Sequence, residues 1–232
     1  MSSQEIRIPA AGRLLEGTLE PAGTGNALVL FAHGSGSGRH SPRNREVAAT
    51  LREAGISTLL FDLLTPEEER EDRYTAHRRF DIPLLAARLI AATQWARSRD
   101  AGGARLAIGY FGASTGAAAA LVAAARLAET VAAVVSRGGR PDLAGDALGE
   151  VEAPTLLVVG ERDAQVIELN QAAYAQLHCE KELVLVPRAT HLFEEPGTLA
   201  QAAALAADWF RRHLLAPDGA RAPRGAPAGR RA

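Results

Sequence analysis

Short, continuous apolar runs recur along the chain and are separated by longer amphipathic segments. Such runs are typical of strands buried on both faces of a parallel sheet. Two partly alternating stretches near the N-terminus instead predict an antiparallel strand pair at one edge of the sheet. Strands that alternate with helices predict an α/β fold with a mostly parallel sheet, covered by helices on both faces. The alternating stretches are 5–9 and 14–19, and the apolar runs are 27–32, 56–61, 106–111, 131–135, 155–159 and 183–186.

Helix starts are marked by capping residues and by proline at the first helical position. They fall between the apolar runs, as an alternating fold requires. The predicted helices begin at Ser41-Pro42, at the Thr65–Glu68 capping box, at about residues 81 and 166, and at Thr198 with Gln201.

We expect one domain over residues 1–216. Within it, residues 65–80 are densely charged and are expected to form a short, solvent-exposed, lid-like segment over the carboxyl edge of the sheet. From about Pro217 the chain contains almost only Ala, Pro, Gly and Arg. This composition cannot bury a core, so residues 217–232 are expected to be disordered.

Charge and cysteine content exclude several kinds of function. The net charge of -1 gives no electrostatic basis for binding nucleic acid or an anionic membrane. No apolar run is long enough to cross a bilayer, and the N-terminus lacks the pattern of a signal peptide. Cys179 has no second cysteine to pair with, and without clustered histidines a zinc site is not expected. The sequence therefore predicts a cytoplasmic protein with no metal and no cofactor.

One stretch carries the main chemical motif of the chain. The apolar run 106–111 ends in Gly112-Ala113-Ser114-Thr115-Gly116, and an alanine-rich segment follows. A strand, a sharp turn and a helix are the context of a G-x-S-x-G nucleophile elbow. Gly112 and Gly116 remove side chains where strand and helix approach closely. The N-terminus of the following helix favours negative charge beside Ser114, which is therefore the candidate nucleophile.

The later part of the chain contains two candidates for the partners that such a serine needs. Asp163 and His191 each follow an apolar run, so both are expected at the same edge of the sheet as Ser114. The order Ser, Asp, His is that of α/β-hydrolases. His191 is the candidate general base, and Asp163 is the group that orients it. Asp142 is an alternative acid, although the tight turn at Gly160 favours Asp163.

A glycine-rich loop at residues 33–42 follows the run 27–32. One interpretation places half of an oxyanion hole in this loop. The backbone N–H of Ser35, or of Gly36, would then face the N–H of Thr115 across the substrate carbonyl oxygen.

The same loop has a second interpretation as a dinucleotide-binding turn. Gly34-Ser35-Gly36 begins a G-x-G-x-x-G pattern, and Asp62 ends the next strand, where an acid that binds ribose would lie. Arg39 stands where the third glycine is required, and nucleotide binding leaves Ser114 without a role. The oxyanion interpretation is therefore favoured.

Charged residues near these turns are candidates for substrate binding. Arg39 and His40 stand in the loop beside Gly36, where they could line the substrate entrance. Arg137 and Arg140 flank a glycine turn after the run 131–135, and two arginines there could recognise an anionic group. All four could equally be solvated loop residues.

These motifs resemble the α/β-hydrolase superfamily, and more closely the dienelactone hydrolase-like family, from about Ala27 to Leu215. Residues 136–143 are similar to a branch whose hydrolase domain occurs alone or fused to a phosphoribosyltransferase-like domain, a second domain not expected here. The resemblance implies an eight-stranded sheet and hydrolysis of esters or lactones. Dienelactone hydrolases proper carry cysteine at the elbow, so Ser114 implies hydrolysis but not dienelactone as the substrate. The most specific stretches are His33-Gly34-Ser35-Gly36-Ser37, Gly112-Ala113-Ser114-Thr115-Gly116, Gly160-Glu161-Arg162-Asp163 and Ala189-Thr190-His191-Leu192-Phe193.

The sequence therefore predicts a serine hydrolase that cleaves small carboxylic esters or lactones through an acyl-enzyme on Ser114. One alternative is a nucleotide- or phosphate-binding protein that uses the Gly34–Gly38 loop. Another is a hydrolase fold without activity that acts as an interaction module. The expected partner is a small-molecule ester or lactone, with no nucleic acid and no membrane. The pattern does not predict the acyl group or the oligomeric state.

Overall fold

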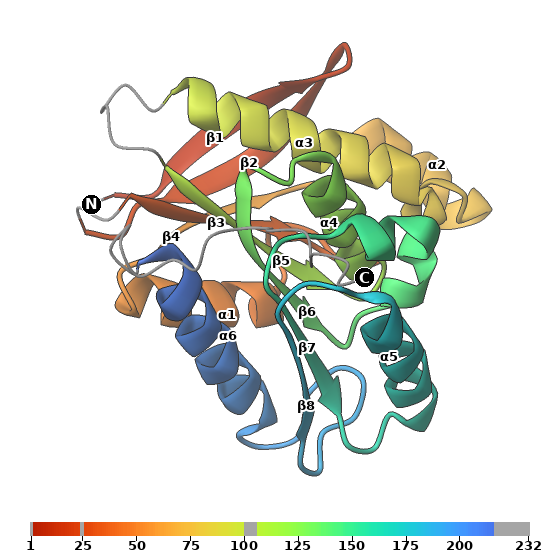
Figure 1. The fold of residues 1–232 in the computed structure, drawn as a ribbon. Coiled ribbons are helices and arrows are strands. Elements are labelled where there is room, and N and C mark those ends of the chain that lie inside the picture. Colours follow the sequence, from red (N-terminus) through yellow and green to blue (C-terminus); the bar gives the residue numbers. More distant parts are fainter. Residues whose placement is uncertain (1, 24–25, 100–105, 216–232) are drawn as a thin grey trace, which may run out of the picture.

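A central sheet organises the molecule (Figure 1). The computed structural model describes residues 2–23, 26–99 and 106–215, and eight strands in these residues form one sheet. In spatial order they are β1 (Gln4–Ala10), β2 (Arg13–Glu20), β4 (Ser57–Phe61), β3 (Ala27–Ala32), β5 (Ala107–Ala113), β6 (Val131–Arg137), β7 (Thr155–Gly160) and β8 (Lys181–Val186). β2 pairs antiparallel with both β1 and β4, and the remaining neighbours are parallel. The sheet expected from the sequence is confirmed.

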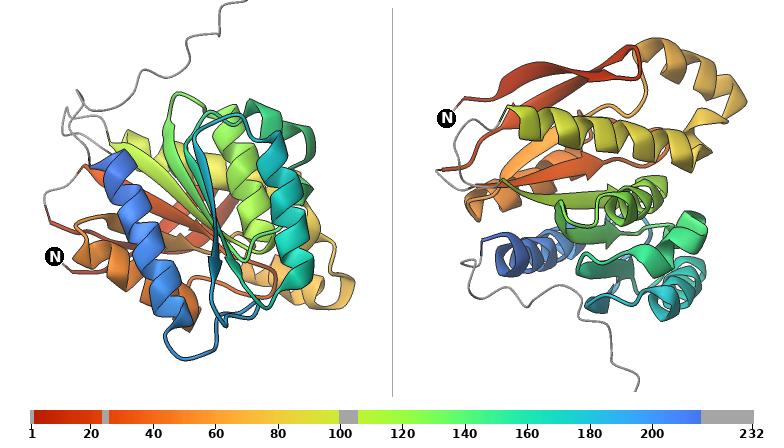
Figure 2. Two further views of the ribbon diagram at one scale, coloured as in Figure 1. Left: turned by 60° about the horizontal axis from the view of Figure 1, so that its bottom comes forward. Right: turned by 45° about the horizontal axis from the view of Figure 1, so that its top comes forward.

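Helices cover both faces of the sheet, as Figure 2 shows. α1 (Pro42–Glu53) and α6 (Thr198–Leu214) pack together on one face. α3 (Ile82–Ser98), α4 (Thr115–Arg126) and α5 (Ala164–Gln176) pack on the other face. Every residue of β3, β5, β6 and β7 is buried between the two layers, which explains their continuous apolar character.

Three short elements complete the fold. α2 (Pro66–Thr75) and the 3-10 helix η1 (Arg78–Phe80) lie between β4 and α3. A longer 3-10 segment, η2 (Pro141–Glu150), follows β6 and bends at Gly145. The sequence did not predict η1 or η2, because neither carries a cap or a repeat long enough to indicate a helix.

The predicted cap of the last helix is wrong. Gly197, in the left-handed conformation (φ 81°), occupies the N-cap position of α6, and Thr198 is the first helical residue. The Thr198 hydroxyl donates to the carbonyl of Glu195 at 2.7 Å. A glycine at this position supplies a left-handed turn that a threonine cap would not adopt.

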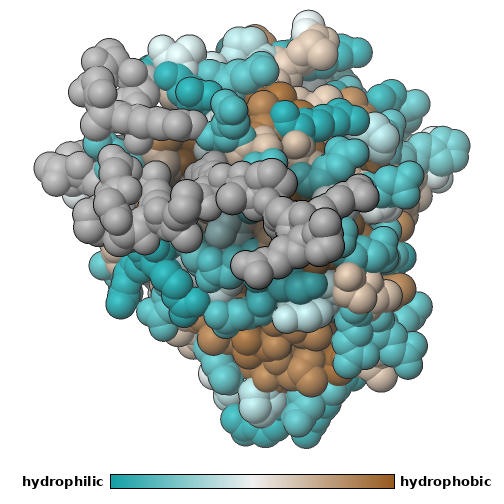
Figure 3. All heavy atoms as spheres, in the orientation of Figure 1, coloured by the Kyte–Doolittle hydropathy of each residue, from teal (hydrophilic) through white to brown (hydrophobic). Residues whose placement is uncertain are grey.

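Outside the grey atoms, Figure 3 shows mostly hydrophilic residues on the face seen in Figure 1, with an apolar area over β7 and β8. β8 is the last strand of the sheet, and its Leu185 is 42% exposed. Within the described residues, no helix combines the length and the apolar character needed to cross a lipid bilayer.

The charged segment at residues 65–80 is anchored more firmly than the sequence suggested. The predicted capping box is confirmed: the Thr65 hydroxyl accepts from Glu68 N, and the Glu68 carboxylate accepts from Thr65 N. Glu68 is buried and receives two hydrogen bonds of 2.6 Å from Arg88 of α3. Burial opposes the charge of Glu68, but the hydrogen bonds from Arg88 and Thr65 lower its pKa to about 2. α2 is therefore tied to the core, although most of its side chains are exposed.

Replacing Arg88 with methionine should lower the free energy of unfolding by about 3–5 kcal/mol, because it leaves the Glu68 carboxylate buried without its partner. A urea denaturation curve, monitored by circular dichroism, measures this change in the free energy of unfolding. Arg70→Met is the matched control, since Arg70 pairs with Glu67 while both side chains are exposed. Equal stability of the Arg88→Met variant and the control would contradict the anchoring of α2 by this ion pair.

Candidate active site

Ser114 stands on a strained turn between β5 and α4. Its backbone has φ 50° and ψ -125°, a conformation that a serine rarely adopts. A Cβ on Gly112 would lie 2.5 Å from the Cα of Ala117, and a Cβ on Gly116 would lie 2.0 Å from the carbonyl oxygen of Ala32. Both glycines are therefore required by close packing, as the sequence predicted. The result is a sharp turn that holds Ser114 at the carboxyl edge of the sheet.

His191 and Asp163 contact each other directly. The Nδ1 of His191 lies 2.7 Å from the Oδ2 of Asp163, across the carboxyl ends of the neighbouring strands β7 and β8. The close crossing depends on Gly160, where a Cβ would lie 2.5 Å from the carbonyl oxygen of Ala189. Because the carboxylate accepts the proton of Nδ1, Nε2 is the nitrogen left to accept a further proton.

Ser114 and His191 line the same cavity, which has a volume of about 250 Å³. The cavity lies at the carboxyl ends of the parallel strands, the edge at which α/β sheets bind ligands. The three residues that the sequence singled out by order are thus brought to one edge, with Asp163 in contact with His191 and Ser114 in the cavity that His191 lines.

Asp142, the alternative acid, and Asp62, the candidate ribose-binding acid, are both engaged elsewhere. Asp142 receives two hydrogen bonds from Arg140, at 2.9 and 2.8 Å. The carboxylate of Asp62 is ion-paired with Arg39. The structure therefore pairs Asp163, rather than Asp142 or Asp62, with His191.

The glycine-rich loop after β3 lies against the elbow. The hydroxyl oxygens of Ser35 and Thr115 are 3.1 Å apart, so the two residues predicted to form the oxyanion hole are neighbours. A Cβ on Gly34 would lie 2.8 Å from the Cβ of Ser114, which explains the glycine at that position. Neither the Ser35 N–H nor the Thr115 N–H donates to another group in residues 2–23, 26–99 and 106–215.

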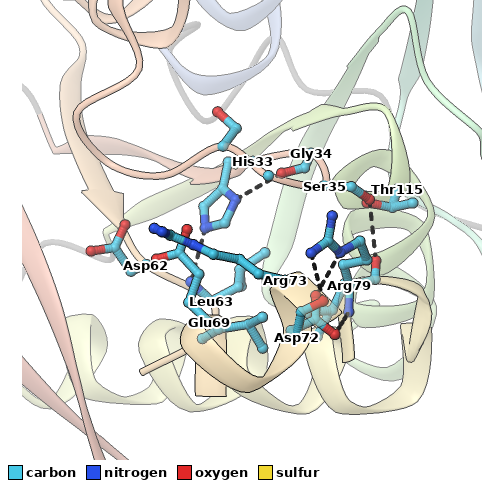
Figure 4. Close-up of a pocket in the computed structure, with 14 residues that line it drawn as sticks. His33, Gly34, Ser35, Asp62, Leu63, Glu69, Asp72, Arg73, Arg79 and Thr115 are labelled. Atoms are coloured by element: carbon cyan, nitrogen blue, oxygen red, sulfur yellow. Dashed lines mark hydrogen bonds and ion pairs between the residues drawn. The ribbon is translucent and has the colours of Figure 1, made fainter. Parts of the chain in front are cut away.

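His33 fixes the start of this loop (Figure 4). The N–H of Leu63 donates to Nε2 of His33 at 3.0 Å, so Nδ1 carries the ring proton and donates to the carbonyl of Gly34 at 3.0 Å. Burial lowers the pKa of His33, which favours this neutral form. His33 therefore holds the loop against the end of β4.

A second cavity, of about 310 Å³, lies on the other side of the loop and is shown in Figure 4. It shares Gly34, Ser35 and Ser37 with the first cavity, and Thr115 also lines it. Part of its lining comes from the segment between β4 and α3 and carries several charged side chains. These are Asp62, Glu69, Asp72, Arg73 and Arg79.

The predicted substrate-binding residues separate into two groups. Gly36 lines the second cavity, and Arg137 lines the first. Arg39, His40 and Arg140 line neither of these two cavities.

Arg39 is held by its partners in the loop. Its guanidinium pairs with Asp62 and lies 2.8 Å from Glu16, and its N–H donates to Asp62 at 2.7 Å. These contacts give Arg39 a role in fixing the loop. They offer no support for its predicted role in substrate binding.

Sequence reasoning missed Arg43 and Asn44, which also line the first cavity. Both lie in the first turn of α1. A signal was present, because the helix that follows a parallel strand begins at the carboxyl edge, so its first residues lie near the site. No group of three or more His, Cys, Asp or Glu side chains suited to a metal ion occurs in the part of the chain that the structure describes.

Comparison with known protein families assigns the chain to a family, and its fold is consistent with that assignment. A model of the alpha/beta hydrolase domain matches residues 25–206, and the chain belongs to this family. It is similar to a solved structure described as a dienelactone hydrolase from Anabaena variabilis ATCC 29413, with 54% identity and a TM-score of 0.88. That match covers 92% of this chain and 98% of the other. The resemblance to dienelactone hydrolases expected from the motifs is confirmed.

Other relatives carry different names. Two curated proteins from strains of Mycobacterium tuberculosis, each named a putative phosphoribosyl transferase, are 57% identical over 217 residues. The match covers 94% of this chain and 48% of theirs, so the chain spans about half the length of these relatives. An esterase from Pyrococcus furiosus shares the fold, with a TM-score of 0.74 and 16% identity over 92% of each chain.

Proposed function

We propose that the chain is a serine hydrolase that cleaves small carboxylic esters or lactones through an acyl-enzyme on Ser114. The observation that carries the proposal is the 2.7 Å contact between His191 Nδ1 and Asp163 Oδ2, at the cavity that His191 shares with Ser114. A serine hydroxyl is a weak nucleophile, and it needs an oriented base of this kind. The two cavities, about 250 and 310 Å³, favour small substrates.

In the first half of the reaction, Ser114 Oγ attacks the carbonyl carbon of the substrate while its proton passes to His191 Nε2. The carbonyl oxygen becomes negatively charged and accepts hydrogen bonds from the N–H groups of Ser35 and Thr115. The bond to the leaving oxygen then breaks, and that oxygen takes the proton from His191. Asp163 holds the ring and stabilises its protonated form.

In the second half, water attacks the acyl carbon as His191 accepts one of its protons. The new tetrahedral intermediate collapses, the carbonyl–Ser114 bond breaks, and the serine oxygen recovers the proton. The products are a carboxylic acid and an alcohol, or a hydroxy acid when the substrate is a lactone. No other reactant is needed.

The nucleotide-binding alternative is less well supported. Nucleotide binding by the Gly34–Gly38 loop would use Asp62 as the acceptor for a ribose, but Arg39 already pairs with that carboxylate. The relatives named phosphoribosyl transferases match this chain over about half of their length. The side chains around Ser114 suit acyl transfer, which favours ester hydrolysis for this chain.

Hydrolysis of 4-nitrophenyl butyrate by purified full-length protein tests the proposal. Ser114→Ala should lower turnover by at least ~10³-fold. Ser37→Ala, which removes another hydroxyl from the lining of the same cavity, should leave turnover within about 3-fold of wild type, because Ser37 has no partner in the proposed reaction. Activity that survives Ser114→Ala would overturn the proposal.

A further inference from the structure

Arg137 is a buried guanidinium without a matching anion. It is the last residue of β6, and it is 8% exposed. Its Nε and Nη1 atoms are buried and have no hydrogen-bond partner within the described residues. Buried arginines are normally paired with a carboxylate or hydrogen-bonded on most of their donors. Arg137 therefore differs from Arg140, whose guanidinium binds Asp142 with two hydrogen bonds.

The cavity that Arg137 lines is the one that contains Ser114 and His191. No Asp or Glu is among the residues that line this cavity. A second guanidinium, that of Arg43, also lines it, and the nearest acid to Arg43 is the exposed Glu194, at 3.4 Å. The lining of this cavity is thus cationic, and no carboxylate residue is part of it.

Of the two guanidinium groups, that of Arg137 is buried and that of Arg43 is partly exposed. Burial, together with the nearby charge of Arg43, lowers the pKa of Arg137 to about 10. Arg137 still carries its charge at neutral pH, since this pKa lies well above 7. A bound anion would supply the hydrogen-bond acceptors that Nε and Nη1 lack, and the planar fork of arginine suits carboxylate and phosphate oxygens.

We propose that the ester or lactone hydrolysed at Ser114 carries an anionic group, a carboxylate or a phosphate, which Arg137 binds in the cavity beside the serine. Arg43 adds positive charge to the same subsite. The proposal rests on the proposed hydrolase function and names the class of its substrate.

A structural role is the competing explanation. The guanidinium of Arg137 lies 5.6 Å from the ring centre of Phe193, two residues after His191, and this cation–π contact could hold the His191 loop. An arginine that only held this loop would affect charged and neutral substrates alike. An arginine that binds the substrate would affect the charged one.

Two pairs of esters, each pair differing in one anionic group, separate these roles. Monoethyl adipate is compared with diethyl adipate for a carboxylate, and butyryl glycerol phosphate with monobutyrin for a phosphate. Wild type should hydrolyse at least one anionic member with a kcat/KM at least ~10-fold above that of its neutral partner. Arg137→Gln should lower kcat/KM for that anionic ester by about 10–100-fold and leave the neutral ester within about 3-fold.

Arg140→Gln is the matched control. It removes the same charge, but Arg140 lies three residues further along the chain and does not line the cavity. It should retain the preference. Equal kcat/KM of wild type for both members of both pairs would overturn the proposal, whether or not the variants fold. An equal loss on charged and neutral esters in Arg137→Gln would also overturn it, in favour of the structural role. A neutral phosphonate that reacts with Ser114 provides a separate test of the hydrolase function. If Ser114 is labelled but the preference for anionic esters is absent, only the present proposal fails. If Ser114 is not labelled, the proposed hydrolase function itself fails.

Discussion

Asp163→Asn is expected to lower ester turnover by about 10³–10⁴-fold while leaving the fold intact. In the wild type, the Asp163 carboxylate lies 2.7 Å from His191 Nδ1. A carboxylate there keeps the proton on Nδ1 and leaves Nε2 as the base. An asparagine can present an N–H instead, which favours the opposite tautomer and removes the base that Ser114 requires. Steady-state hydrolysis of 4-nitrophenyl butyrate measures the loss.

Asp142→Asn is the control for this prediction. Asp142 was the alternative acid in the sequence, and in the structure it binds Arg140. Turnover by Asp142→Asn should stay within a few-fold of wild type, since the residue does not contact His191. If Asp142→Asn showed the large loss and Asp163→Asn did not, the assignment of the acid would be wrong.

Gly116→Ala should have the second large effect. A Cβ at this position would lie 2.0 Å from the carbonyl oxygen of Ala32 and 2.6 Å from that of His33. Both atoms belong to the backbone, so either the loop that carries Ser35 or the elbow itself must move. We expect the free energy of unfolding to fall by about 3 kcal/mol and turnover to fall by at least ~10²-fold, because a displacement of about 1 Å in an active site has that effect.

Gly149→Ala provides the comparison. The nearest atom to a Cβ at Gly149 is 3.9 Å away, and the residue is exposed. Urea denaturation and ester turnover of this variant should match wild type. A Gly116→Ala protein with wild-type stability and turnover would show that the close approach of elbow and loop is not needed.

The sequence predicted the layers of the fold because its central strands are buried on both faces. Such strands are continuous apolar runs, and their limits were correct to within one residue for β3, β4 and β7. The burial of Glu68 was not predictable in this way. Its partner, Arg88, lies 20 residues further on in a mostly apolar helix, so the charged segment of α2 had the composition of a solvated one.

The candidate site was predictable as far as it depends on strand order. Ser114, Asp163 and His191 each follow a strand, and the parallel sheet brings the ends of those strands to one edge. Arg137 and Arg140 show where this reasoning stops. The sequence placed both in a turn, whereas β6 continues to Arg137 and buries it. Polar residues at the end of an apolar run do not indicate where a strand ends, because burial depends on the helices that pack over it.

Labelling of the full chain by a fluorophosphonate, followed by mass spectrometry of its peptides, tests most directly whether Ser114 is an activated nucleophile. The expected result is one modified peptide, the one that contains Ser114, in wild type and in Ser37→Ala, with the modification lost in Ser114→Ala. An unmodified wild-type protein, or modification of another residue that persists in Ser114→Ala, would contradict a serine hydrolase built on Ser114.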